Sequence, residues 1–277
     1  MTIKKTENIP DTDSKSFTSH LDDLRKHLIR IILVVLLLSI VAFIFKNLIF
    51  DKILFAPKEA NFITYKALCY LGSHLKISSM CINVENFPLI NLELAGQFRA
   101  HIVVSIISGI ILSFPYLIWE LWRFVKPALK VNERKYSRSL ILSTSILFFA
   151  GVLFGYFIIT PLTINFLSTY EVSHQLQDMF NFRNYISIIT TLTLAIGIVF
   201  ELPVLVYFLS KMDIISPLFL KKYRKHAIVL LFIISAIITP PDVFSQILVA
   251  IPLYLLFELS IIISKRVYKK KEKEIFG

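Results

Sequence analysis

The chain lacks the short sequence signatures of the common enzyme classes. It contains no G-x-S-x-G motif, no H-E-x-x-H motif and no Walker A sequence. Its six histidines are scattered along the chain and form no metal-ligand set. An intramembrane protease would need a Ser/His pair, a metal motif or paired aspartates within its apolar segments, and the chain has none of these. We therefore expect no catalytic residues, no metal, no cofactor and no enzymatic activity.

Cysteine is nearly absent as well. The two cysteines, Cys69 and Cys81, lie in one hydrophilic segment. Neither has a second ligand pair at metal spacing, so a zinc site is not expected. A local disulfide can form if this segment faces an oxidising compartment, and two free thiols are an equally good interpretation.

Charged residues are few, at 18% of 277 residues against 56% apolar residues. A soluble domain of this length would not need so much apolar content, so the composition is typical of a polytopic membrane protein. The net charge of +11 does not indicate nucleic acid as a partner, because the basic residues cluster between apolar runs. The first 27 residues are polar and show no cleavable signal peptide, so the first apolar run is expected to remain as a membrane anchor.

Six apolar segments predict six transmembrane helices in an all-α membrane protein. They cover approximately residues 28–45, 101–119, 139–170, 184–210, 227–238 and 243–264. A full crossing needs roughly 20 residues. The fifth segment is therefore short, and so is the part of the sixth before Glu258. Pro240 and Pro241 separate these two segments, because consecutive prolines cannot continue a helix.

The distribution of lysine and arginine predicts the orientation. Twenty-three of the 30 lie in residues 1–30, 119–139, 211–226 and 265–277, and the segments between contain the other seven. Cytoplasmic loops have an excess of these residues, so both termini are predicted to be cytoplasmic. We expect residues 1–277 to form a single polytopic domain, with a flexible N-terminal segment (1–17) and a basic C-terminal tail (265–277).

One carboxylate lies inside an apolar segment. Glu201 is followed closely by Pro203 within the fourth segment. An ionised carboxylate near the bilayer centre costs roughly 2.5 kcal/mol or more, so an intramembrane Glu is a functional hypothesis by default. The alternative is a helix end that reaches the headgroups. Pro203 removes a backbone donor and should bend the helix close to it.

Two polar stretches lie at the predicted cytoplasmic face. Before the first apolar segment, leucines share one helical face, while Asp22, Asp23 and Arg25 lie on another. This pattern predicts an amphipathic helix along the membrane surface, and an ordinary polar helix start explains it equally. In the second stretch, Trp122 and Phe124 are either membrane-interface anchors or the walls of a site that includes Glu133.

Five blocks of the sequence, in order, resemble the TatC family, the receptor subunits of the twin-arginine protein translocase. The blocks are residues 20–25 (HLDDLR), 115–134 with the Pro-Ala-Leu and Asn-Glu-Arg sequences, 154–162 (FGYF followed by Pro-Leu), 200–204 (FELPV) and 239–252 (TPPDVFSQ followed by Ile-Pro). Together they extend the resemblance from about residue 17 to about residue 264.

The resemblance implies a fold and a function. The fold is a concave, glove-like arrangement of six helices with the last two short. The implied function is binding of the twin-arginine signal peptides of folded precursors at the cytoplasmic face of the bacterial inner membrane. Assembly with single-span TatA- and TatB-type proteins and with other TatC copies is implied as well, with export driven by the proton-motive force. The surrounding basic residues would also attract anionic membrane lipids.

The resemblance also assigns roles to residues. The two carboxylates that contact the arginine pair correspond to Asp23 and Glu133; the family usually has Glu where Asp23 stands, so the charge is kept with a shorter reach. Signal-peptide binding further involves Arg25, Trp122 and Phe124. Intramembrane polar or partner contacts are assigned to Glu201, Gln246 and Asp242, and structural roles to Pro57, Pro127, Pro203, Pro240 and Pro241.

A proton-coupled small-solute transporter is the alternative function. In such a protein Glu201 would bind an ion. Transporter folds often contain internal repeats with paired broken helices. The two halves of this chain show no repeat, which favours the translocase subunit.

Overall fold

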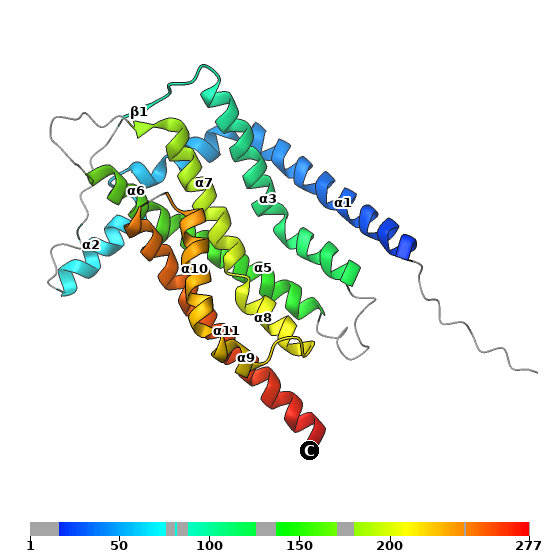
Figure 1. Ribbon diagram of the computed structural model, residues 1–277. Helices are drawn as coiled ribbons and strands as arrows, with labels where there is room; N and C mark the ends of the chain where they lie inside the picture. Colours follow the sequence, from blue (N-terminus) through cyan, green and yellow to red (C-terminus); the bar gives the residue numbers. More distant parts are fainter. Residues whose placement is uncertain are drawn as a thin grey trace, which may run out of the picture.

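The computed structural model describes residues 17–75, 81, 88–125, 137–170, 180–240 and 242–276 (Figure 1). The longer helices are α1 (Phe17–Ile44), α2 (Ile63–Leu75), α3 (Gly96–Val125), α5 (Ser137–Phe154), α6 (Thr160–Thr169), α7 (Phe182–Val199), α8 (Leu202–Lys211), α10 (Arg224–Ile238) and α11 (Val243–Phe276). The shorter elements are η1 (Leu48–Leu54), η2 (Ala56–Lys58), η5 (Gly155–Ile159), α9 (Pro217–Lys222), β1 (Leu89–Ile90) and β2 (Phe180–Asn181).

Five segments within the described residues are long and apolar enough to cross a membrane. They are Leu21–Ile44, Gly96–Val125, Leu140–Thr169, Phe182–Lys211 and Val243–Glu272. These correspond to the first four predicted spans and the sixth. The fifth predicted span is α10, whose 15 residues extend about 22 Å at 1.5 Å per residue, less than the roughly 30 Å of a bilayer core. The short fifth helix is thus confirmed, and six crossings are compatible with this arrangement.

The last helix is longer than the sequence predicts. α11 has 34 residues and continues through Glu258 and the basic tail to Phe276, so the prediction of a short last helix is wrong. Polar residues extend it because they find partners: Glu258 forms an ion pair with Arg224 of α10. Farther along, Lys271 Nζ donates to the Lys211 carbonyl at 2.6 Å and to Asp213 at 2.7 Å.

The amphipathic segment predicted before the first span is not a separate surface helix. α1 runs without a break from Phe17 to Ile44, and this stretch contains no Gly or Pro that would interrupt it. The predicted leucine face is exposed, with Leu21, Leu24 and Leu28 each between 42% and 53% accessible. The acidic residues of this segment are therefore carried on the first turns of a transmembrane helix.

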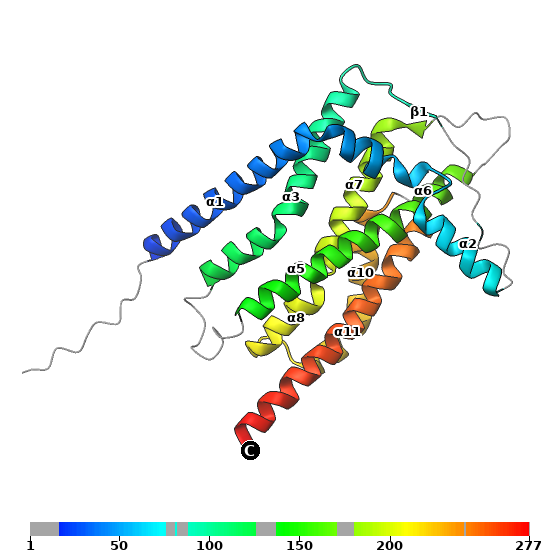
Figure 2. The same ribbon diagram turned by 180° about the vertical axis from the view of Figure 1, so that it is seen from behind.

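The described parts of the four basic segments lie at one end of the molecule. Figures 1 and 2 show that the start of α1, the end of α3, the α8–α10 region and the end of α11 are all at this end. We call it the basic end. The opposite end contains η1, α2 and the β1–β2 pair. This arrangement brings the charge clusters of distant sequence segments to a common side.

Several contacts tie the segments of the opposite end together. β1 pairs in parallel with β2, so the segments before α3 and α7 are joined. Glu93 forms ion pairs with Arg99 of α3 and Arg183 of α7. The buried Tyr65 hydroxyl lies 3.0 Å from the Pro57 carbonyl and 3.1 Å from the Pro161 carbonyl. Desolvation raises the pKa of Tyr65 above its ordinary range, so this hydroxyl stays a donor.

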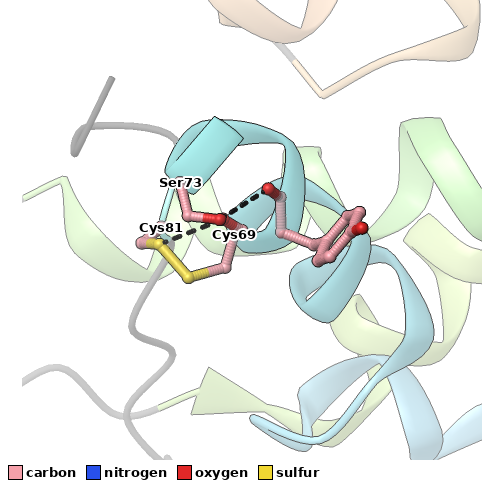
Figure 3. The surroundings of a disulfide bond; sticks show 4 residues. Cys69, Ser73 and Cys81 are labelled. Carbon is pink, nitrogen blue, oxygen red and sulfur yellow. Dashed lines mark hydrogen bonds between the residues drawn. A yellow bond between two sulfur atoms is a disulfide. The ribbon is translucent and has the colours of Figure 1, made fainter. Parts of the chain in front are cut away.

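A disulfide closes the segment that follows α2. Cys69, on α2, is bonded to Cys81, and next to them Ser73 Oγ donates to the Tyr70 carbonyl at 2.7 Å (Figure 3). Of the two interpretations of the cysteine pair, the structure therefore contains the disulfide.

α1 packs along α3 through small residues. A Cβ atom on Gly109 of α3 would lie 2.1 Å from Ser39 Oγ and 2.8 Å from Ser39 N, so the two backbones approach closely here. Ser105 and Ser113, four residues before and four residues after Gly109, are buried on the same face of α3. Nearer the opposite end, the His101 ring stacks on Phe43 with centroids 3.8 Å apart. α3 is thus the helix that positions α1.

The bundle is hollowed beside this helix pair. A cavity of about 810 Å³ opens there, lined by residues of α1, η1, α2, α3, α5, η5 and α7. Its wall is mostly apolar, with Lys52 and Glu59 as its charged members. An open hollow on one side of the helices agrees with the expected concave arrangement.

Candidate functional site at the basic end

Asp23 lies on the face of α1 that packs toward α3. Asp23, His27, Ile31 and Val34 are half-buried, while most residues between them are exposed. This spacing of four, four and three residues marks one side of a helix. Asp22 and Arg25 are exposed on other sides. The structure therefore separates Asp23 from the neighbours with which the sequence grouped it.

A buried carboxylate lies between the two helices at this end. Glu120 of α3 is fully buried, and its Oε1 is 2.8 Å from His27 Nδ1 and 3.0 Å from Arg30 Nη1, both on α1. An ionised carboxylate only accepts, so His27 is the donor through Nδ1–H. Oε2 is 4.0 Å from Arg123 Nη1 and accepts no hydrogen bond within the part of the chain described.

The two predicted aromatic site residues point in different directions. The Phe124 ring meets the His27 ring edge-on, with centroids 5.8 Å apart, so it lies beside the Asp23 face of α1. Trp122 packs instead against Phe208 of α8, with centroids 5.4 Å apart. They diverge because residues two apart on a helix do not share a face. Of the aromatic pair, only Phe124 is brought to the α1–α3 junction.

Two predicted residues of this region, Glu133 and Pro127, lie outside the described residues. In sequence they belong to the connection from Val125, the end of α3, to Ser137, the start of α5. Both of these helix ends are at the basic end. The described site therefore consists of Asp23 and Phe124, the cluster around Glu120, and the exposed Arg25.

The fourth span is interrupted where predicted. α7 ends at Val199 and α8 begins at Leu202, with Pro203 in its first turn. Pro203 has no N–H to bond the Val199 carbonyl, so the helix cannot continue regularly. Glu201 lies in this break, and its Oε1 is buried without a hydrogen bond from the described residues.

The residues predicted near the α10–α11 turn have contacts within the chain. Asp242 caps α11, because its Oδ1 accepts from the Ser245 N–H at 2.6 Å. The Asp242 N–H in turn bonds the Pro240 carbonyl at 2.7 Å. Gln246 Nε2 donates to the Phe232 carbonyl of α10 at 3.1 Å. Pro241, the other proline of the turn, lies outside the described residues.

Sequence reasoning missed Glu120 and its partners. The residue stands in an aromatic stretch where it looks like a single tolerated charge. Its two α1 partners are 93 and 90 positions away in sequence. The one local signal was Arg123, three positions later, which fits an i,i+3 pair.

The chain is a polytopic helical membrane protein, because its long apolar helices can cross a bilayer. A candidate binding site lies at its basic end, between α1 and α3. The family model for TatC, the Sec-independent protein translocase protein, matches residues 19–252. The chain belongs to the TatC family. It is a bacterial multi-pass membrane protein and a translocase subunit, not an enzyme.

Individual relatives agree with this assignment. The chain is 45% identical to TatC of Blattabacterium sp. subsp. Periplaneta americana over 92% of this chain and 97% of the relative. It is 34% identical to TatC of Desulforapulum autotrophicum over 95% of this chain and 89% of the relative. A crystal structure of the twin arginine translocase receptor TatC matches with a TM-score of 0.70 and 34% identity, over 90% of this chain and 99% of that one. The small-solute transporter is not supported by these similarities.

Proposed function

We propose that the basic end binds the twin-arginine signal peptide of folded precursor proteins, with Asp23 and Glu133 as the carboxylates that receive the arginine pair. The observation that carries the proposal is the position of Asp23 on the α3-facing side of α1. Glu133 belongs in sequence to the connection that follows α3. Phe124, beside His27, supplies an apolar wall on the Asp23 side of α1. Arg25 and Trp122 lie around this junction on other faces.

The chemistry of the two groups supports this assignment. A guanidinium presents a rigid fork of donors that a carboxylate can accept at two points, and the ammonium of lysine cannot reproduce it. Two carboxylates at separate positions would select for two arginines by geometry. A half-buried position such as that of Asp23 strengthens the interaction, because the local dielectric is lower than in water.

The proposed partners follow from the family and from the surface of the chain. Single-span proteins of the TatA and TatB type, and other copies of this chain, would dock on apolar helix faces within the bilayer. α1 offers such a face, since only 6% of its most apolar window is buried within the chain. Glu201, whose Oε1 has no hydrogen-bond partner among the described residues, is the proposed polar contact for a partner helix during transport driven by the proton-motive force.

Both termini are proposed to be cytoplasmic, because the basic end has the excess of lysine and arginine. A cysteine introduced at the exposed Lys270 should react with a membrane-impermeant maleimide only after the cells are broken. The matched control is Leu94→Cys at the opposite end, where Leu94 is fully exposed and should label in intact cells. Labelling of residue 270 from outside intact cells would contradict this orientation.

Photo-cross-linking tests the binding site directly. A photoreactive amino acid at position 23 or 133 should cross-link to a signal peptide that contains two arginines, and the yield should fall when both are changed to lysine. The same amino acid at the neighbouring exposed Asp22 serves as the control. Equal yields for the arginine and lysine peptides at all three positions would rule out the assignment.

A further inference from the structure

The carboxylate of Glu120 joins α1 to α3 at the basic end. It is fully buried, and its two hydrogen-bonding partners, His27 and Arg30, both come from α1. The one cation near it from its own helix is Arg123, at 4.0 Å. A buried carboxylate is costly unless it is paired and hydrogen-bonded, so these contacts are strongly favoured once the helices meet.

A second close contact between the two helices lies farther along. Gly109 meets Ser39 eleven residues before Glu120, about 16 Å along α3 at 1.5 Å per residue. That contact is between small residues and sets the distance between the backbones. It lies sixteen residues beyond Asp23 along α1. At the basic end, the Glu120 cluster and the edge-on contact of Phe124 with His27 hold the first turns of α1 against α3.

The partners of Glu120 are aligned with Asp23. His27 follows Asp23 by four residues and Arg30 follows it by seven, so all three share one side of α1. A hydrogen bond to His27 therefore acts one turn away from Asp23. A rotation of α1 by one residue, about 100°, would move Asp23 off the α3-facing side.

We propose that Glu120 is a positioning residue for signal-peptide recognition: through His27 and Arg30 it fixes the rotation of α1 that presents Asp23 to a guanidinium of the peptide. The inference rests on the proposed function of Asp23. Glu120 also holds the positive charge of Arg30 against α3. Without this carboxylate, Arg30 would be released beside the site that must receive two arginines.

A double-mutant cycle tests the proposal on the full-length protein in nanodiscs. The measurement is the affinity for a fluorescent synthetic peptide that contains the arginine pair. Glu120→Gln should weaken binding about tenfold in the wild-type background, the loss expected when a charged hydrogen-bond partner is removed. In the Asp23→Asn background it should change the affinity less than about twofold, because residues that act through one another are not additive. Equal losses in both backgrounds, or none in either, would overturn the proposal.

Glu93→Gln is the matched control. Glu93 also pairs with two arginines and also joins two helices, but at the opposite end. Its neutral variant should leave the peptide affinity unchanged. A loss equal to that of Glu120→Gln would assign both effects to general stability and would contradict a positioning role.

A spectroscopic measurement keeps the test independent of peptide binding. Spin labels at the exposed positions Lys26 of α1 and Leu121 of α3 report the arrangement of the two helices. Their distance distribution should broaden in Glu120→Gln and in the paired variant Glu120→Gln/Arg30→Gln, which removes both members of the ion pair. An unchanged distribution would overturn the proposal. If Asp23→Asn alone leaves peptide affinity unchanged, the proposed function fails, while the distance measurement still decides whether Glu120 fixes α1.

Discussion

Replacing both Asp23 and Glu133 by their amides is expected to weaken binding of a twin-arginine peptide about a hundredfold. A charge-assisted hydrogen bond is worth roughly 1.5–3 kcal/mol, so the loss of either carboxylate should cost about tenfold or more. The two residues belong to different segments, one on α1 and one in the connection after α3. If each receives one arginine, the two losses should approximately add in free energy. Titration of the labelled peptide against the purified protein measures both single variants and the double variant.

Two further variants make this prediction specific. Asp22→Asn removes the same charge from an exposed position one residue away, and it should leave the affinity nearly unchanged. Asp23→Glu keeps the charge and adds one methylene, so it should be tolerated. The wild-type preference for arginine over lysine should shrink in the neutral variants. Unchanged affinity in both Asp23→Asn and Glu133→Gln would exclude these residues as the arginine acceptors.

The membrane architecture could be predicted from composition because the bilayer imposes a simple length and polarity requirement on each span. Five predicted segments appear as long apolar helices, and α10 is short as expected. The length of α11 could not be predicted from apolar content. Its polar half is stabilised by Arg224 and by the α8–α9 turn, which are distant in sequence.

The candidate site could be predicted only in part, since sequence spacing gives helical faces but not the neighbours of each face. Asp22 and Asp23 look equivalent in the sequence. Packing of α1 on α3 distinguishes them, because only Asp23 lies on the packed side. This packing depends on the close contact between Gly109 and Ser39, which are 70 positions apart in sequence. The same packing buries Glu120 against His27 and Arg30 of α1. A local sequence pattern contains no information on such a pairing, so the sequence alone assigns no role to Glu120.

Glu201→Ala is expected to lower the transport rate about tenfold, whereas Glu201→Gln should retain clearly more activity. The Glu201 Oε1 is enclosed but accepts no hydrogen bond from the described residues, in a membrane-spanning segment where a buried polar atom without a partner is costly. We expect the Glu201 carboxylate to form a hydrogen bond with a partner helix, or to become protonated, during transport. Glutamine keeps the capacity to hydrogen-bond and loses only the charge, while alanine loses both. The tenfold loss expected for Glu201→Ala corresponds to roughly one hydrogen bond to a charged group.

The surroundings of Glu201 indicate that the carboxylate is held in place. A Cβ atom on Gly151 of α5 would lie 2.7 Å from the Phe200 Cβ, so the residue before Glu201 is pressed against α5. After it, Pro203 and Tyr207 line a cavity of about 310 Å³ between α5, α8 and α11. The backbone at Glu201 is therefore held between Phe200, which is packed on α5, and Pro203, which lines this cavity.

Measurement of precursor export in cells that express each variant at equal levels tests this prediction. Glu258→Ala is the matched control, because Glu258 also has a buried Oε1 without a hydrogen bond from the described residues, but its Oε2 has an ion-pair partner in Arg224 of α10. Its replacement should lower the thermal stability of the purified protein and leave the export rate close to that of the wild type. Glu201→Ala should lower the export rate and leave the thermal stability nearly unchanged. A carboxylate oxygen without a partner among the described residues adds little to the stability of the isolated chain. A wild-type export rate in Glu201→Ala at normal expression would show that Glu201 is only a tolerated polar residue.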